Sequence, residues 1–250
     1  MDEITTTVDG PALTVTINRP AKRNALTAAM YRELATVLRG AGDARVVVLT
    51  GAGGTFSAGN DLADFVGDFQ ADDAVWQFQQ AVLDTTAVLV AAVDGPAVGI
   101  GATVLLHCDL VYATERSYLQ FPFVNLGVVP EFGSSLVLTQ RVGRHHAAEL
   151  LLFGDRVTAA DARQLGLVNE VLPDADALQA RVKDRLDALL AKPARALKET
   201  KALLHGTIDP HDQLRRESVV FGELLGDPET QARIAALAGG RKAAGQPGVS

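Results

Sequence analysis

The chain begins with two short runs in which apolar and polar residues alternate, at positions 4–8 and 13–17. Asp9-Gly10 lies between the two runs, and a turn pair in this place predicts a β-hairpin. Positions 46–49 and 88–93 are instead continuously apolar, the pattern of strands that are covered on both faces. The pattern therefore predicts a sheet whose inner strands lie between two layers.

Helical periodicity follows the hairpin. Thr27 can cap a helix that places Met30, Leu34 and Leu38 on one face and ends near Gly40. Thr158, with Asp161 three residues later, resembles a capping box that opens another helix. Further helices are predicted at 75–83 and 101–107, and further strands at 109–111 and 118–121.

The last third of the chain is helical in pattern. Helices are predicted over 175–190, 193–204, 211–224 and 228–237, with a frayed tail from Gly239-Gly240. The polar segment 64–73 predicts a mobile loop or a loosely packed helix over the site. Alternation of strands and helices in the first part predicts an α/β fold.

Composition narrows the classes of function. The 250 residues are 48% hydrophobic and carry a formal net charge of −7, which argues against a nucleic-acid partner. Cys108 is the single cysteine and lies in an apolar run, so a buried structural thiol is expected. His145 and His146 are adjacent and would diverge on a helix, and we expect no metal site. Without a targeting segment or a membrane-length apolar run, we expect a cytoplasmic enzyme.

Two segments share the order of buried strand, glycine-rich turn and helix start. The first leads from 46–49 to Gly59 and Asn60, and the second leads from 88–93 to Gly99 and Ile100. Backbone N–H groups at two such helix starts can converge on one carbonyl oxygen and form an oxyanion hole. The alternative is a pair of ordinary glycine turns, with Asn60 or Asp61 as a helix cap.

Together with other motifs in the same order, these turns resemble the enoyl-CoA hydratase/isomerase (crotonase) superfamily. Positions 18–26, Asn-Arg-Pro-Ala-Lys-Arg-Asn-Ala-Leu, resemble its first acyl-CoA loop, and 126–131 and 165–171 follow as the family has them. The resemblance implies an α/β spiral of repeated β-β-α units over 1–190 and a C-terminal helical oligomerisation lobe over 191–250. It also implies an acyl-CoA substrate, no cofactor beyond the coenzyme A of that substrate, and a homotrimer or dimer of trimers.

The resemblance also assigns site residues. The oxyanion donors would be the backbone N–H groups of Asn60 and Ile100, although the family usually has glycine at the second position, so the Ile100 side chain is expected to narrow the pocket. The residues expected along coenzyme A are Lys22, Arg23, Ala25, Leu26, Ala58, Gly59, Asp61 and Leu62. Solvated loop charge is the alternative for Lys22 and Arg23. Further candidates near the C-terminus are Phe221, Arg241 and Lys242.

The acid/base residue separates the branches of the family. Hydratases use two glutamates, and the matching positions here are Thr103 and Phe123, which are not useful bases near neutral pH. Glu131 follows Pro130, as the lone glutamate does in the Δ3,Δ2-enoyl-CoA isomerase branch. A single carboxylate can take a proton from C2 of a 3-enoyl thioester and return it to C4. The alternative for Glu131 is a first-turn glutamate that interacts with a helix dipole.

We therefore predict an isomerase that converts 3-enoyl-CoA to 2-enoyl-CoA through a stabilised enolate, with Glu131 as the acid/base. An enoyl-CoA hydratase is the nearest alternative. Thioester hydrolysis, other reactions of the superfamily and a non-catalytic acyl-CoA-binding protein also stay open.

Overall fold

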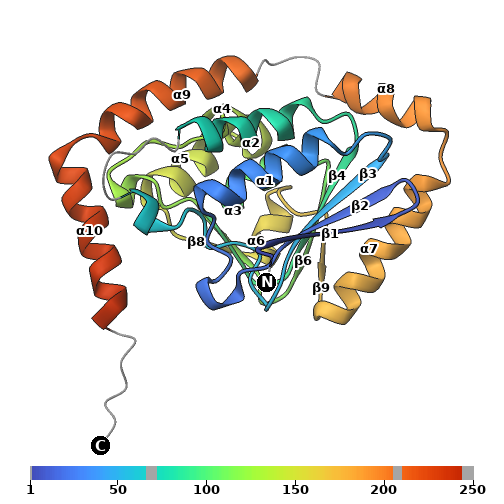
Figure 1. Cartoon of the computed structure of the whole chain (residues 1–250), viewed down its shortest axis with the longest axis horizontal. Coiled ribbons are helices and arrows are strands. Elements are labelled where there is room, and N and C mark those ends of the chain that lie inside the picture. Colours follow the sequence, from blue (N-terminus) through green and yellow to red (C-terminus); the bar gives the residue numbers. More distant parts are fainter. Residues whose placement is uncertain (1, 66–71, 205–209, 244–250) are drawn as a thin grey trace, which may run out of the picture.

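A computed structural model describes residues 2–65, 72–204 and 210–243. Its centre is a six-stranded sheet in the order β1-β2-β3-β4-β6-β9, in which β1 is antiparallel to β2 and the other neighbours are parallel (Figure 1). The strands are β1 (Ile4–Asp9), β2 (Ala12–Ile17), β3 (Val46–Gly51), β4 (Val88–Val93), β6 (Leu110–Thr114) and β9 (Glu170–Leu172). The predicted hairpin and both buried strands are confirmed.

A second, three-stranded sheet lies beside the first. It consists of β5 (Pro96–Val98), β7 (Tyr118–Gln120) and β8 (Arg156–Thr158). The chain passes from β4 to β5 and then to α3 (Ile100–Thr103), and later from β6 to β7 and then to the 3-10 helix η4 (Val124–Leu126). This repeated step from long strand to short strand to helix is the crotonase-type spiral that the sequence predicts.

The inner strands bury side chains on both faces. On β4, Leu89, Ala91 and Val93 join the larger core, and Val88 and Val90 point into a second core on the opposite face. The larger core is covered by α1 (Ala28–Arg39) and α2 (Asp72–Asp84), and the second by α7 (Ala175–Leu190). Apolar burial on both faces is the main stabilising term for such strands.

The C-terminal helices are α8 (Ala194–Leu204), α9 (Pro210–Leu225) and α10 (Pro228–Ala243). Helix α9 lies across α2 and α4 (Ser134–Val142), and α10 packs on η4 and on the 3-10 helix η2 (Leu62–Phe65) (Figure 1). Helix α10 continues past the predicted end at position 237 to Ala243. The middle of the predicted loop 64–73, residues 66–71, lies outside the described residues.

Local capping explains two helix starts. The Thr27 hydroxyl accepts a hydrogen bond from the Met30 N–H at 3.3 Å, and the Thr158 hydroxyl accepts from the Asp161 N–H at 3.1 Å. Thr158 thereby opens α6 (Ala159–Gln164). The predicted helix 101–107 is α3 followed by the 3-10 helix η3 (Val104–His107). The sequence pattern did not predict α4, α5 (Arg144–Phe153) or the 3-10 helix η1 (Pro20–Lys22).

No helix in the described ranges is long and apolar enough to cross a membrane. Within those same ranges, no group of three His, Cys, Asp or Glu side chains could hold a metal ion.

Candidate active site

The two glycine turns lie against each other. The Ser57 carbonyl accepts a hydrogen bond from the Val98 N–H at 2.9 Å, and the Ser57 N–H donates to the Pro96 carbonyl at 3.1 Å. Gly59 has φ +86°, and a Cβ there would lie 2.8 Å from the Val98 carbonyl oxygen. A side chain at position 59 would therefore be strained and would push the two turns apart.

The backbone N–H groups of Asn60 and Ile100 end these turns. Among the described residues neither N–H donates a hydrogen bond, and Ile100 is the first residue of α3, whose N–H has no acceptor within the helix. Both donors are thus available to the oxygen of a ligand. Packing of Gly101 on Ser57, where a Cβ would lie 2.8 Å from the Ser57 carbonyl, keeps the start of α3 beside the first turn.

Tyr31 on α1 positions the side chain of Asn60. The Tyr31 hydroxyl donates a hydrogen bond to the Asn60 side-chain oxygen, and Tyr31 is buried. The Tyr31 hydroxyl therefore fixes the first turn through Asn60, from the buried side of that turn. The sequence pattern shows Tyr31 only as a core position of the helix and does not indicate this contact.

Glu131 is buried between two helices. Its carboxylate oxygens accept hydrogen bonds from the Thr103 hydroxyl at the end of α3 and from the Gln79 amide on α2. Thr103 lies three residues after Ile100, so the carboxylate is held within one helical turn of the second free N–H. The threonine at the position of the missing hydratase glutamate thus binds the remaining glutamate.

The pKa of Glu131 is raised to about 8, chiefly by burial and also by the negative charge of Glu217, which together outweigh the lowering effect of the Thr103 and Gln79 hydrogen bonds. A carboxyl group with this pKa is protonated for most of the time at pH 7 and releases its proton just above neutrality. Such a group can both accept and donate a proton near physiological pH.

The loop after Glu131 is fixed from two further directions. The Phe132 carbonyl lies 2.7 Å from His107 Nε2, and the two rings stack with centroids 4.1 Å apart. Glu217 on α9 accepts hydrogen bonds from the Gly133 and Ser135 N–H groups at the start of α4. A carboxylate at this place satisfies N–H groups that the helix leaves unpaired.

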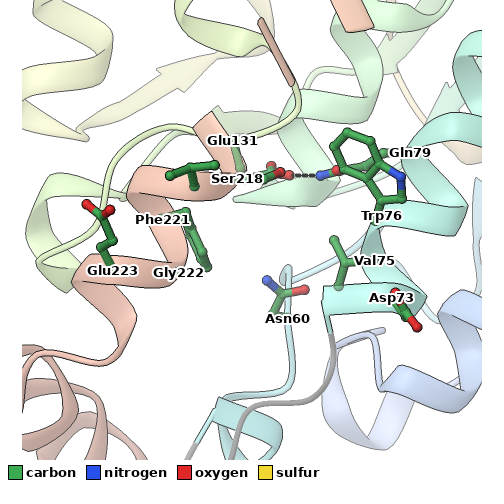
Figure 2. Close-up of a pocket in the computed structure, with 11 residues that line it drawn as sticks. Asn60, Asp73, Val75, Trp76, Gln79, Glu131, Ser218, Phe221, Gly222 and Glu223 are labelled. Atoms are coloured by element: carbon green, nitrogen blue, oxygen red, sulfur yellow. Dashed lines mark hydrogen bonds between the residues drawn. The ribbon is translucent and has the colours of Figure 1, made fainter. Parts of the chain in front are cut away.

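Two cavities meet at Asn60 and Phe221, which line both of them. The first cavity, of about 450 Å³, contains Glu131 and lies between α2 and α9. Figure 2 shows Glu131 joined to Gln79 by a hydrogen bond, Trp76 and Val75 on the α2 side, and Ser218 and Gly222 on the α9 side. The second cavity, of about 330 Å³, is lined by Ala58, Gly59, Leu62, Gly99 and Ile100 and by apolar residues of η4, α9 and α10.

The residues expected along coenzyme A form two adjacent strips of backbone. The Ala58 N–H donates to the Arg23 carbonyl at 3.0 Å, the Leu26 N–H donates to the Gly59 carbonyl at 2.8 Å, and the Asp61 N–H donates to the Leu26 carbonyl at 2.9 Å. Ala58 and Leu62 line the second cavity, while Ala25 and Leu26 are buried behind it.

Lys22 and Arg23 are exposed at the surface of the same loop. Arg19 forms an ion pair with Asp61 at 2.7 Å. Burial opposes ionisation of Asp61, but the hydrogen bond and charge of Arg19 outweigh it and hold the pKa of this carboxyl below its usual value. The loop therefore carries two cations, Lys22 and Arg23, beside a fixed ion pair.

Other sequence predictions have mixed outcomes. Phe221 lines both cavities, whereas the side chains of Arg241 and Lys242 lie outside the described residues. Ile100 lines the second cavity but is 2% exposed and belongs to the larger core, so most of its side chain points away from a ligand. Cys108 is buried, as expected.

These features define a class of protein: an α/β spiral in which two backbone N–H groups, without an acceptor among the described residues, lie at two adjoining cavities, one of which contains the buried carboxyl of Glu131. The family model described as "Enoyl-CoA hydratase/isomerase" matches residues 9–237, which extends the resemblance into α10. The chain belongs to the enoyl-CoA hydratase/isomerase family.

Some relatives are named enoyl-CoA isomerases and others enoyl-CoA hydratases. Enoyl-CoA delta isomerase 2 of Rattus norvegicus is 37% identical over 211 residues, which cover 80% of this chain and 54% of that protein. A probable enoyl-CoA hydratase of Rhodobacter capsulatus is 34% identical over 218 residues, which cover 84% of each. The chain spans about half the length of the curated isomerases that it matches.

Among solved structures, an enoyl-CoA hydratase/isomerase from Pseudoalteromonas atlantica T6c superposes with a TM-score of 0.90 at 34% identity, and the match covers 100% of both chains. The structural match therefore extends over the whole chain, including the C-terminal helices.

Proposed function

We propose that this protein is an enoyl-CoA isomerase that moves the double bond of a 3-enoyl-CoA thioester to the conjugated 2,3 position. The observation that carries this proposal is the single buried carboxyl, Glu131, in the cavity that begins at Asn60. The relatives that are named isomerases support it.

In the proposed reaction, the thioester oxygen accepts hydrogen bonds from the Asn60 and Ile100 N–H groups at the junction of the two cavities. These donors stabilise the negative charge that develops on this oxygen when C2 loses a proton. The ionised Glu131 takes that proton, the C2–H electron pair forms a C1=C2 bond, and the carbonyl electron pair moves onto the oxygen. When this enolate collapses, the carbonyl re-forms, the C1=C2 pair forms the new C2=C3 bond, and the C3=C4 pair takes the proton from Glu131 at C4, which regenerates the carboxylate.

Coenzyme A belongs in the second cavity. The backbone strip from Ala58 to Leu62 lies beside the free N–H of Asn60, so a pantetheine arm can follow it to the thioester. The anionic nucleotide needs local cations, because the chain as a whole is acidic, and Lys22 and Arg23 supply them at the surface. No metal or redox cofactor takes part.

Hydration is the second candidate reaction, because some relatives are named hydratases. It needs one group that activates water and another that protonates the α-carbon. At the two positions that resemble those glutamates, Thr103 already binds Glu131 and Phe123 is a buried apolar ring. The chemistry of these side chains favours isomerisation over water addition.

The test is the Glu131→Gln variant with a 3-enoyl-CoA and, separately, a 2-enoyl-CoA. General acid–base catalysis is typically worth about 10²–10⁴-fold, so isomerisation should fall by at least the lower figure while acyl-CoA binding persists. Glu149→Gln on α5, where the side chain is exposed, is the control for a lost surface carboxylate.

If the parent adds water to the 2-enoyl thioester and leaves the 3-enoyl thioester unchanged, it is a hydratase. If neither substrate reacts but both bind, the protein is an acyl-CoA-binding protein, and release of free coenzyme A would identify a thioesterase.

A homotrimer or a dimer of trimers remains part of the proposal. Leu186, Leu189 and Leu190 on α7 pack against the second core, so they do not support an interface. Leu203 and Leu204 on α8 and Val219 on α9 are instead exposed. Sedimentation at micromolar concentration should show three or six copies, and a stable monomer would contradict the proposal.

A further inference from the structure

Gly222 lies in the wall that α9 contributes to the cavity around Glu131. It follows Ser218 by four residues, and both line the cavity on the side opposite to Trp76 (Figure 2). Helix α9 continues to Leu225, so the glycine is within the helix and not at its terminus. A glycine at such a position costs about 1 kcal/mol of helix stability relative to alanine.

Nothing in the backbone explains this glycine. Its φ is not positive, and a Cβ built on it meets no atom within 4 Å. Among the described glycines up to position 226, each other one either has a positive φ or would bring its Cβ within 4 Å of a neighbouring atom. Position 222 could therefore hold a Cβ without backbone strain or a clash within the protein.

Gly222 lines the cavity, and the space where its Cβ would lie is open. Glu131 lines this cavity and not the second one, so the carbon chain that Glu131 deprotonates lies between α2 and α9. Trp76 forms the opposite wall, and Gly222 is exposed, so the cavity continues to the surface past the glycine. An acyl chain that extends beyond the Trp76 ring can leave the cavity past Gly222, where α9 has no side chain.

We propose that the missing side chain at position 222 keeps an exit open from the acyl cavity, and that this exit lets the protein take acyl-CoA thioesters with chains longer than the cavity holds. Gly222 is then a residue that determines chain-length specificity. This inference rests on the proposed function, since it places the acyl chain beside Glu131.

The test compares the parent with Gly222→Leu on 3-hexenoyl-CoA and 3-dodecenoyl-CoA. The parent should turn over both. Lost pocket space typically costs about 10–200-fold in specificity, so kcat/KM of Gly222→Leu for the long substrate should fall at least tenfold more than for the short one. Val220→Leu is the matched control, because Val220 is on the same helix but does not line the cavity, and its ratio of the two kcat/KM values should equal that of the parent.

Gly222→Ala is a second variant that controls for loss of activity through misfolding of Gly222→Leu. It should raise the melting temperature, because alanine favours the helix, and should still lower the long-to-short ratio, though less than leucine does. An unchanged ratio in both variants would overturn the inference and leave the proposed function intact, as would a parent that rejects the long substrate. If the parent isomerises neither substrate, the proposed function fails, and calorimetric binding of dodecanoyl-CoA and hexanoyl-CoA to the same variants decides the role of Gly222 without turnover.

Discussion

Glu217 on α9 accepts hydrogen bonds from the hydroxyl and the backbone N–H of Ser135, 82 residues earlier in the chain, at 2.6 and 3.1 Å. A third bond comes from the Gly133 N–H. The start of α4 and the loop that carries Glu131 are therefore fixed to the C-terminal helices, and the position of the carboxyl depends on α9.

Replacement of Glu217 should act on Glu131 in two ways. Glu217→Ala leaves buried N–H groups without an acceptor and should lower the free energy of unfolding by about 1–3 kcal/mol. Glu217→Gln keeps an acceptor but removes a charge that raises the pKa of Glu131, so the pH profile of kcat/KM should move to lower pH. The groups that face Glu131 in this comparison are Glu217, Thr103 and Gln79.

The matched control for Glu217 is Asp212→Asn, an exposed carboxylate on the same helix that pairs with Arg215. Its pH profile should coincide with that of the parent. A Glu217→Gln profile that also coincides would mean that Glu217 anchors α4 without influencing the base.

The activity itself should depend on pH through Glu131. The base must be ionised in the free enzyme, and its pKa is raised to about 8, so kcat/KM should increase with pH up to about 8 and then level off. Steady-state rates with a 3-enoyl-CoA between pH 6 and about 9.5 measure this. A rate that is already constant between pH 6 and about 7 would show that the carboxyl ionises at its ordinary pKa.

The free energy of unfolding should decrease as pH rises, whereas kcat/KM should increase. Because the pKa of Glu131 is higher in the folded protein than in the unfolded chain, the folded protein retains a proton that the unfolded chain has lost. The stabilisation is complete below the unfolded pKa of about 4.5 and is lost as pH rises to about 8, by about 1.4 kcal/mol for each unit in between. Urea unfolding of the parent and of Glu131→Gln should show this loss in the parent and a smaller one in the variant.

Removal of the second N–H donor should stop turnover. Proline is tolerated at the first position of a helix, where Ile100 lies, so Ile100→Pro should fold. Loss of one oxyanion donor typically costs about 2.7–4 kcal/mol of barrier. Ile100→Ala removes more side chain but keeps the N–H, and it should retain most of its activity if the protein remains folded by circular dichroism. Equal activity of the two variants would refute the donor role of Ile100.

Cys108 should be inert in the folded protein. Burial, with the nearby charge of Asp109, raises the pKa of the thiol to about 12, and the thiolate is the reactive form. A thiol reagent at neutral pH should therefore label Cys108 only as fast as the protein unfolds. Rapid labelling under native conditions would contradict the buried position.

The elements that the sequence predicted best are those with a strong local pattern. Positions 88–93 are apolar throughout and form β4, and Thr27 opens α1, because these signals depend on neighbouring residues. Helices α4 and α5 were missed, since their apolar faces are weak and glycines interrupt their ends. Glu131 was selected as a candidate from its motif, and the structure shows it buried at a cavity.

The partners of Glu131 could not be recognised from sequence. Gln79 and Glu217 are polar residues on helices whose solvent faces are also polar, and their burial follows from packing between segments 52 and 84 residues apart. Thr103 was noticed only at the position of a missing glutamate, although its hydroxyl donates a hydrogen bond to Glu131. Such contacts depend on tertiary structure, which no local pattern encodes.

Two neighbouring faces of helix α9 have different roles: one is buried and carries Glu217, and the other lines the cavity. Along α9, Leu214 and Glu217 are buried against the protein, and Ser218 and Gly222 lie one position further round the helix, beside the cavity. Substrate range can therefore be altered at 218 and 222 without disturbing the anchor at 217. Libraries for new acyl substrates should vary positions 218 and 222 and keep Leu214 and Glu217 fixed, so that the range of substrates can diverge while the position of Glu131 is retained.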